Sequence, residues 1–235
     1  MTNNFVLWAA GITLGLASGL SLALDVQLAP DKESIQVKHQ GKMFRVERNQ
    51  DPTHVVDDSW AKTSRKCPPF CPQPMMVAPG VKTAGELEVF DFMENQINKG
   101  TGLLIDARIE SWYLKGTIPG SINIPFTVFE RKGTPELDKA MNLLGAKPRS
   151  NVGTVAATWD KTLKAVGVDT RKQGAWDFGE VKEVMFWCNG PWCGQSPHAI
   201  HALLDHGFPA DKIHYYRGGM QMWEIMGLPV VTPEE

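Results

Sequence analysis

The feature that most constrains the fold is an alternation of helix and strand patterns from Gly80 onward. Apolar residues recur at helical spacing in segments 83–99, 135–144, 158–166, 196–206 and 220–226. Short apolar runs typical of buried strands lie between them, at residues 102–106, 121–125, 181–187 and 212–215. Strands that alternate with helices predict an α/β fold, with a parallel sheet flanked by helices on both faces. The first helix is expected to start at a capping box of Thr83 and Glu86.

Two segments precede this alternating region. Residues Ser34–His39 and Lys42–Arg48 alternate apolar and polar side chains on either side of a Gln-Gly pair, which predicts a β-hairpin. Residues 49–80 contain six prolines and predict an irregular arm that lies against the main domain. We therefore expect a hairpin and a Cys/Pro-rich arm at residues 24–79, and one domain at residues 80–235.

The start of the chain predicts export. No side chain before Asp25 is charged, and the stretch Phe5–Leu24 is apolar. This pattern is typical of a secretory signal peptide, with residues 21–23 as a small-x-small cleavage site. The stretch is also long enough to span a bilayer, so a retained membrane anchor is the alternative for residues 1–23. In either case we expect a periplasmic location for the folded part, with membrane contact only if the segment is retained.

Charge and motifs exclude several classes of function. The net charge is −2, from 24 basic and 26 acidic residues, and there is no long basic run, so nucleic acid is not an expected partner. The chain has no Gly-rich phosphate loop and no zinc-protease motif. Its four cysteines lack the usual C-x-x-C spacing of zinc and iron–sulfur sites. No metal and no cofactor is therefore expected.

The segment Val184–Ser196 joins a buried-strand pattern to a cysteine loop. The apolar run stops at Cys188, passes through a Gly/Pro loop and restarts as a helix at Ser196-Pro197, an N-cap followed by proline. The Cys188 sulfur is thereby placed where loop amides and the helix dipole converge, a setting that lowers a thiol pKa. Ligands of parallel sheets bind beyond the carboxyl ends of the strands. The pattern predicts a nucleophilic cysteine.

Other interpretations of the cysteines stay open. Cys188 is also compatible with a small buried side chain, or with a disulfide to Cys193. In an oxidising compartment the spacing suggests two local pairs, Cys67 with Cys71 and Cys188 with Cys193. Closing such short loops stabilises a fold only slightly, so each pair is either redox-active or structural. For Cys67 and Cys71 we favour a disulfide that pins the arm.

The order of elements and four motifs together resemble the rhodanese (thiosulfate sulfurtransferase) family. The first motif is an Asp-x-Arg strand ending in Leu103–Arg108, and the second is the Ile-Pro-Gly segment Lys115–Pro125, with Thr117 where histidine is usual. The third is Cys188 itself. The fourth is the closing Gly-Gly, Trp and Gly-Leu-Pro-Val pattern within residues 217–230. The resemblance covers about residues 80–231.

The resemblance implies a single rhodanese domain with sulfurtransferase activity. Cys188 would take the outer sulfur of thiosulfate, a polysulfide or a protein persulfide and carry it as a persulfide. Cys193 would resolve this persulfide as a disulfide, which a thiol reductant protein would then reduce. The matched Asp106 and Arg108 are expected to be structural. The residues expected to bind the substrate are those of the loop cradle, Asn189, Gly190, Pro191, Trp192, Gly194, Gln195 and Ser196.

Three departures from the family bear on the substrate. Seven residues separate Cys188 from Ser196, a longer loop than is usual, and Gln195 stands where a basic residue is usual. The insert at residues 127–180 is also longer than such domains carry. Loss of the cation argues for a donor other than thiosulfate, and the longer loop accommodates a bulkier one. The competing functions are a thiol-disulfide oxidoreductase that uses both cysteine pairs, and a non-catalytic rhodanese-like binding module.

Overall fold

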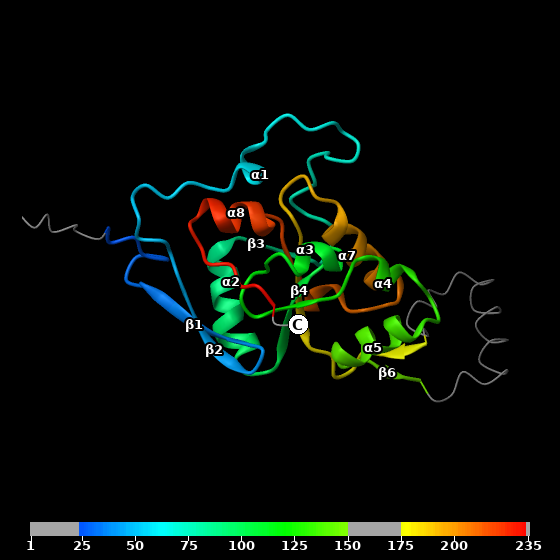
Figure 1. The fold of residues 1–235 in the computed structure, drawn as a ribbon. Coiled ribbons are helices and arrows are strands. Elements are labelled where there is room, and N and C mark those ends of the chain that lie inside the picture. The colour runs from blue at the N-terminus through cyan, green and yellow to red at the C-terminus, as the bar shows by residue number, and fades with distance from the viewer. Residues whose placement is uncertain (1–23, 150–174, 234–235) are drawn as a thin grey trace, which may run out of the picture.

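A computed structural model describes residues 24–149 and 175–233. Its centre is a sheet of five parallel strands in the order β3-β9-β8-β4-β5, with β8 in the middle. Figure 1 labels β3 and β4 of this sheet. The strands are β3 (Lys82–Ala84), β4 (Gly102–Asp106), β5 (Ser121–Asn123), β8 (Glu183–Trp187) and β9 (Ile213–Tyr216). The predicted parallel α/β sheet is therefore confirmed.

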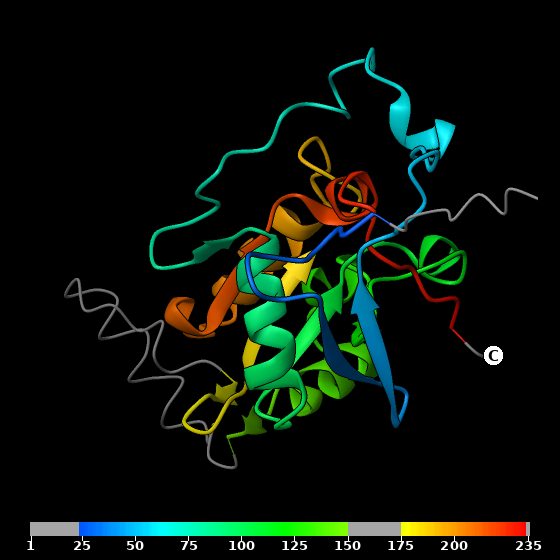
Figure 2. The ribbon, with the colours of Figure 1, turned by 90° about the vertical axis from the view of Figure 1, so that its left-hand side faces the viewer.

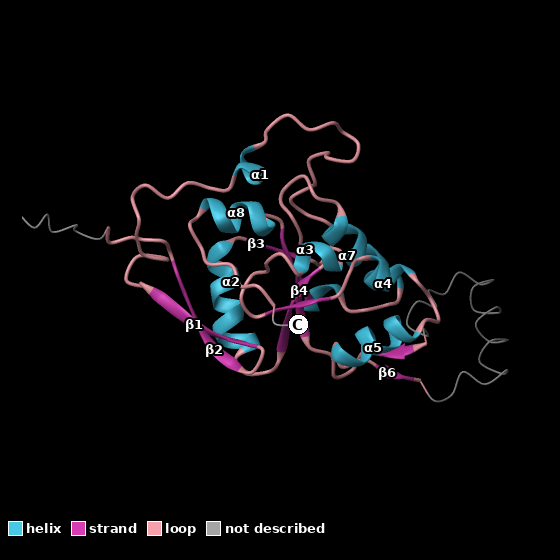
Figure 3. Ribbon diagram, viewed as in Figure 1, coloured by secondary structure: helices cyan, strands magenta, loops and turns pink. Residues whose placement is uncertain are grey.

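Side chains of the central strands alternate between two core layers. On β8, Val184 and Phe186 enter one layer, and Met185 and Trp187 enter the other, as the two-residue period of a strand requires. The first layer packs against helices α4 (Thr127–Glu130), α5 (Pro135–Leu143) and α7 (Gln195–Asp205). The second packs against α2 (Glu86–Phe92), the π-helical turn Met93–Ile97 that extends it, and α8 (Gly219–Ile225) (Figure 3). Both faces of the sheet are thus covered, as predicted.

The predicted hairpin is confirmed. Strands β1 (Ser34–His39) and β2 (Lys42–Glu47) pair antiparallel, and the second strand ends one residue earlier than expected. Ile35 and Val37 are buried in the second core layer, so the hairpin is part of the main core. Asn98 ties it to the helical side, because its side chain accepts a hydrogen bond from the backbone of β1 and donates another to it.

The arm, defined here as residues 49–79, is irregular apart from the single helical turn α1 (Asp58–Ala61). It crosses the molecule above α8 and the loop that follows β8 (Figures 1 and 2). Trp60 of α1 is buried in the second core layer and fastens this part of the arm. Cys67 and Cys71 form a disulfide, so their predicted pairing is confirmed.

The predicted start of the first helix is wrong. Thr83 lies in β3, opposite Tyr215 of β9, and the helix begins only at Glu86. Its N-cap is Gly85, whose backbone N–H donates to the Glu88 carboxylate at 2.8 Å. A three-residue edge strand that runs directly into a helix leaves no break in the apolar pattern, so the sequence does not separate the two elements.

Other expectations concern the insert and the start of the chain. Two short strands, β6 (Lys147–Pro148) and β7 (Trp176–Asp177), pair antiparallel within the insert and were not predicted. The predicted helix at 158–166 and the predicted export segment at 1–23 lie outside the described residues. Within the described ranges, no helix has the length and apolar character that a membrane span needs.

Candidate active site

Cys188 directly follows the middle strand, β8, and lies at the carboxyl edge of the sheet. Trp187, the last residue of β8, pairs with Asp106 of β4 on one side and with Tyr216 of β9 on the other. The chain then leaves the sheet at Cys188, whose carbonyl oxygen accepts a hydrogen bond from Met220 N–H at 2.9 Å. The start of α8 therefore fixes the first residue of the loop, at the edge where parallel sheets bind their ligands.

A glycine permits this close approach between the loop and α8. Gly219 has a φ of +56°, and a Cβ atom there would lie 2.2 Å from the Cys188 carbonyl oxygen. Any side chain would therefore collide with the loop backbone. The next contact is also direct, since Gln221 N–H donates to the Asn189 carbonyl at 3.0 Å. The Gly-Gly motif at the start of α8 thus sets the position of the cysteine loop.

Helix α7 starts one residue earlier than predicted. It begins at Gln195 with Gly194 as N-cap, so Ser196 lies inside the first turn and its predicted capping role is wrong. The turn is closed by His198 N–H, which donates to the Gly194 carbonyl at 3.0 Å. At this helix start, the backbone N–H of Gln195 acts to lower the pKa of Cys193, and the backbone N–H of Ser196 acts to lower the pKa of Cys188. The helix N-terminus therefore serves both cysteines.

The two loop cysteines form a hydrogen-bonded pair. Both are free thiols, with exposed fractions of 2% for Cys188 and 5% for Cys193, so the alternative of a disulfide between them is not realised here. The Cys188 thiol donates to the Cys193 carbonyl oxygen at 3.3 Å, and it is close enough to the Cys193 sulfur to lower the pKa of Cys193. The Cys193 sulfur accepts a hydrogen bond from Asn189 Nδ2 at 3.8 Å, and the protonated Cys193 thiol donates to Gln195 Oε1 at 3.6 Å. Cys193 is thus the more heavily hydrogen-bonded of the two.

The pair places its negative charge on Cys193. Burial, and next the neighbouring Cys193 thiolate, raise the pKa of Cys188 well above its ordinary value, and the Ser196 N–H and hydroxyl oppose this only in part. The hydrogen bond from Cys188 and the backbone N–H groups of Gln195 and Asn189 lower the pKa of Cys193 to about 7, although burial opposes this. The expectation that the loop lowers the Cys188 pKa is therefore wrong, because full burial disfavours a thiolate at Cys188 and a second negative charge beside Cys193 is unfavourable.

Polar groups around the pair have unused hydrogen-bonding capacity. Asn189 Oδ1 and the Tyr215 hydroxyl are buried without a hydrogen-bond partner among the described residues. The Ser196 hydroxyl makes no well-formed hydrogen bond within the same residues, yet it faces Cys188 closely enough to lower its pKa. Burial raises the pKa of Tyr215, the negative charge of the cysteine pair adds to this rise, and the hydroxyl therefore stays a neutral donor. Buried polar groups in this state are suited to binding a substrate.

A buried ion pair supports the site from the adjacent strand. Arg108 Nη2 lies 2.6 Å from Asp106 Oδ2, and the two side chains are 2% and 0% exposed. The same guanidinium donates to the Gly116 carbonyl at 2.6 Å and lies 4.7 Å from the centre of the Trp187 ring. Thr117, at the position where the family usually has histidine, donates to Asp106 Oδ2 at 3.0 Å. These contacts join the end of β4 to residues 116 and 117, and the structural role of Asp106 and Arg108 stays a prediction.

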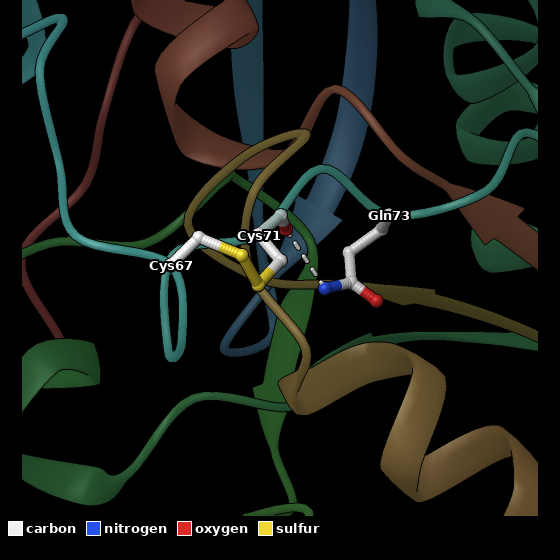
Figure 4. The surroundings of a disulfide bond; sticks show 3 residues. All are labelled: Cys67, Cys71 and Gln73. Carbon is white, nitrogen blue, oxygen red and sulfur yellow. Dashed lines mark hydrogen bonds between the residues drawn. A yellow bond between two sulfur atoms is a disulfide. The ribbon is translucent and has the colours of Figure 1, made fainter.

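The arm is bonded directly to the cysteine loop. Gln73 N–H donates to the Pro191 carbonyl at 2.8 Å, and the Gln73 carbonyl accepts a hydrogen bond from Arg217 Nε at 2.9 Å. Its side chain turns back to the Cys71 carbonyl at 3.0 Å, next to the disulfide (Figure 4). The disulfide thus lies just before the residue that joins the arm to the loop.

A cavity of about 330 Å³ lies where the arm meets the loop. Four of the predicted substrate-binding residues line it, namely Asn189, Trp192, Gly194 and Gln195, together with Cys193. Gly190, Pro191 and Ser196 do not, and the carbonyls of Gly190 and Pro191 bind Cys193 N–H and Gln73 N–H instead. The residues that sequence reasoning missed are Trp60, Arg65, Phe70 and Trp112. The only sequence indication for the first three was that a proline-rich arm must lie against the main domain.

The family model for the rhodanese-like domain matches residues 90–226, more than half of the chain. The chain belongs to the rhodanese-like domain family. The match includes β4, β8 and the whole cysteine loop, whereas the hairpin and the arm lie outside it. No curated protein matches the chain.

Solved structures similar to this rhodanese-like chain have low sequence identity to it. A rhodanese-related protein from Thermoplasma volcanium is 19% identical, with 65% of this chain and 99% of that chain covered and a TM-score of 0.36. A human single-domain sulfurtransferase is 16% identical, with 61% of this chain and 96% of that chain covered and a TM-score of 0.34. A thiosulfate sulfurtransferase from Pseudomonas aeruginosa is 17% identical, with 66% of this chain and 21% of that chain covered and a TM-score of 0.38.

Proposed function

We propose that this rhodanese-like protein is a sulfurtransferase that carries sulfane sulfur as a persulfide on Cys188, with Cys193 as proton acceptor and resolving thiol. The observation that carries the proposal is the buried, hydrogen-bonded cysteine pair beyond the carboxyl end of β8. A pair that shares one negative charge near neutral pH contains both a thiol to be loaded and a base beside it.

Loading starts with proton transfer inside the pair. The Cys193 thiolate takes the proton of the Cys188 thiol, and the Ser196 N–H and hydroxyl stabilise the charge that moves to Cys188. The Cys188 thiolate attacks the outer sulfur of thiosulfate, the donor's S–S bond breaks, and sulfite leaves with the electron pair. A polysulfide or a protein persulfide reacts in the same way, with a shorter polysulfide or a thiolate as leaving group.

Unloading follows one of two routes. A nucleophilic acceptor attacks the outer sulfur and leaves Cys188 as a thiolate. In the other route the proton returns to the persulfide, and the Cys193 thiolate attacks the inner sulfur on Cys188. A Cys188–Cys193 disulfide forms and hydrosulfide leaves with the electron pair. A dithiol reductant protein then restores the two thiols and is itself oxidised to a disulfide.

The test is the intact mass of the protein after incubation with thiosulfate or a polysulfide. The wild type is expected to gain one sulfur atom, and Cys188→Ser none. Cys193→Ser should gain sulfur more slowly, because it lacks the base, and should keep it, because it lacks the resolving thiol. An equal gain in Cys188→Ser would refute the assignment of the sulfur to Cys188.

A thiol-disulfide oxidoreductase is the second candidate, because the arm places a disulfide next to the loop. Phe70, which lies between Cys67 and Cys71, packs edge-on against Trp192 with ring centres 5.3 Å apart. In this function the dithiol of the loop would transfer two electrons and two protons to a disulfide. A wild type that loses two hydrogens, together with a Cys193→Ser variant that gains no sulfur, would favour it. A loop potential below about −300 mV, typical of inert structural disulfides, would contradict it.

We propose further that the protein is exported to the periplasm. The charge-free stretch before Asp25 and the Cys67–Cys71 disulfide support this location, because disulfides persist in oxidising compartments. Cell fractionation with mass measurement of the recovered chain tests it. A periplasmic chain lacking residues 1–23 is expected for a cleaved signal peptide, and a membrane-bound full chain for an anchor. A cytoplasmic full-length chain would contradict export.

A further inference from the structure

The cavity between the arm and the cysteine loop has the walls of a small-molecule site. Trp60 and Phe70 come from the arm, Trp112 from α3 (Glu110–Tyr113), and Trp192 from the loop, and Cys193 lies on the lining. Phe70 and Trp112 are each 38% exposed, so large rings are left open to solvent here. The volume of about 330 Å³ is within the range of ligand pockets, and it exceeds what a small inorganic anion needs.

The aromatic walls are arranged as two ring pairs from distant parts of the chain. Phe70 and Trp192 meet edge-on with ring centres 5.3 Å apart, and the Trp60 and Trp112 centres are 6.4 Å apart in a tilted arrangement. Rings of a ligand pack favourably against such faces and edges. The walls therefore suit a flat aromatic body.

Arg65 brings a positive charge to this pocket. Its guanidinium lies 4.1 Å from the centre of the Trp192 ring and 5.2 Å from that of Phe70. Nη2 donates to the Ser59 carbonyl at 2.9 Å, whereas Nε is buried without a partner among the described residues. Apart from the Cys193 thiol, no acidic side chain of the described residues lines the pocket. A guanidinium carries five N–H donors, so Arg65 can still bind an anion.

We propose that the pocket binds an aromatic anion, with its ring against the exposed rings of Phe70 and Trp112 and its anionic group at Arg65. In combination with the proposed function, this anion is the organic body of the sulfur compound on which the cysteine pair acts. The arm then supplies the cation that the loop lacks at Gln195, and the pocket selects aryl compounds over small inorganic anions.

The probe is benzenesulfonate, which carries a ring and a charge but no transferable sulfur. Binding to the full protein is measured by calorimetry, with methanesulfonate as the probe that lacks the ring. We expect benzenesulfonate to bind at least about tenfold more tightly than methanesulfonate, and Arg65→Gln to weaken benzenesulfonate at least about tenfold. Bound benzenesulfonate should also slow the alkylation of Cys193, which lines the same pocket.

Two variants make the result specific. Arg45→Gln removes an exposed arginine of the hairpin and should leave binding unchanged. If Arg65→Gln alters the unfolding midpoint, Trp112→Leu decides instead, and it should weaken benzenesulfonate more than methanesulfonate. Absence of benzenesulfonate binding, equal affinity for the two probes, or unchanged affinity in the deciding variant would overturn the proposal. Cys188→Ser should bind the probe while it fails to load sulfur, so the pocket and the persulfide mechanism are tested separately.

Discussion

Replacing Cys188 by alanine should raise the pKa of its neighbour Cys193. The hydrogen bond from the Cys188 thiol is the largest cause that lowers this pKa from 9.0 to about 7. A difference of that size corresponds to about 2.7 kcal/mol in favour of the thiolate. At pH 7 about half of Cys193 is a thiolate, against about 1% at its ordinary pKa, so the variant should lose between about fivefold and fiftyfold in thiolate content. The loss is given as a range because the backbone N–H groups of Gln195 and Asn189, which also lower the Cys193 pKa, stay in place in the variant.

The assay is the rate of Cys193 alkylation by iodoacetamide as a function of pH, located by peptide mass. In the wild type the thiolate forms as the pH rises through about 7, so the rate should rise there and level off above. In Cys188→Ala the rise should move to higher pH. Cys188→Ser is the matched control, because its hydroxyl still donates to Cys193 and should keep the rise near the wild-type position. Coincident curves for the alanine variant and the wild type would refute the reasoning.

Two further substitutions test how the site is supported, both by urea unfolding. Asp106→Asn leaves the buried Arg108 without its counter-charge and should lower the free energy of unfolding by about 3–5 kcal/mol, whereas Glu47→Gln, which breaks an exposed pair, should change the midpoint little. Gly219→Ala should cost at least about 1 kcal/mol more than Gly100→Ala. Both glycines have positive φ, but only the Gly219 substitution collides with the Cys188 carbonyl, so equal losses would contradict the close approach.

The sheet was predictable because its strands and helices have separate patterns. Strand β8 ends at Trp187, as predicted. Helix α7, which follows the cysteine loop, starts at Gln195, one residue before its predicted start. The edge strand at Thr83 was missed, because it merges with the pattern of the next helix. Placing Cys188 beyond the middle strand therefore needed only local periodicity and the parallel topology.

The charge of the site was not predictable from the same features. Local sequence puts Cys188 before a helix N-terminus, but its pKa depends on full burial and on Cys193, whose side-chain position is set by the fold of the loop. The pocket is still harder to foresee, because it joins residues more than a hundred positions apart, such as Arg65 and Trp192. The proline-rich arm has no periodicity from which such contacts could be inferred.

The arm residues of the pocket and the cysteine pair lie in different parts of the chain, and this has a practical consequence. The cysteines, their N–H groups and the supporting ion pair lie within the family match at residues 90–226, whereas Arg65 and Phe70 lie outside it. Under the two proposals, the sulfur chemistry and the charge that selects the ligand therefore belong to different stretches of the chain, which are joined at Gln73 and at Trp60. A chimera that places residues 24–79 on another rhodanese-like domain, with Trp112 and Trp192 introduced, would transplant the pocket and leave the recipient's own sulfur-handling cysteine in place.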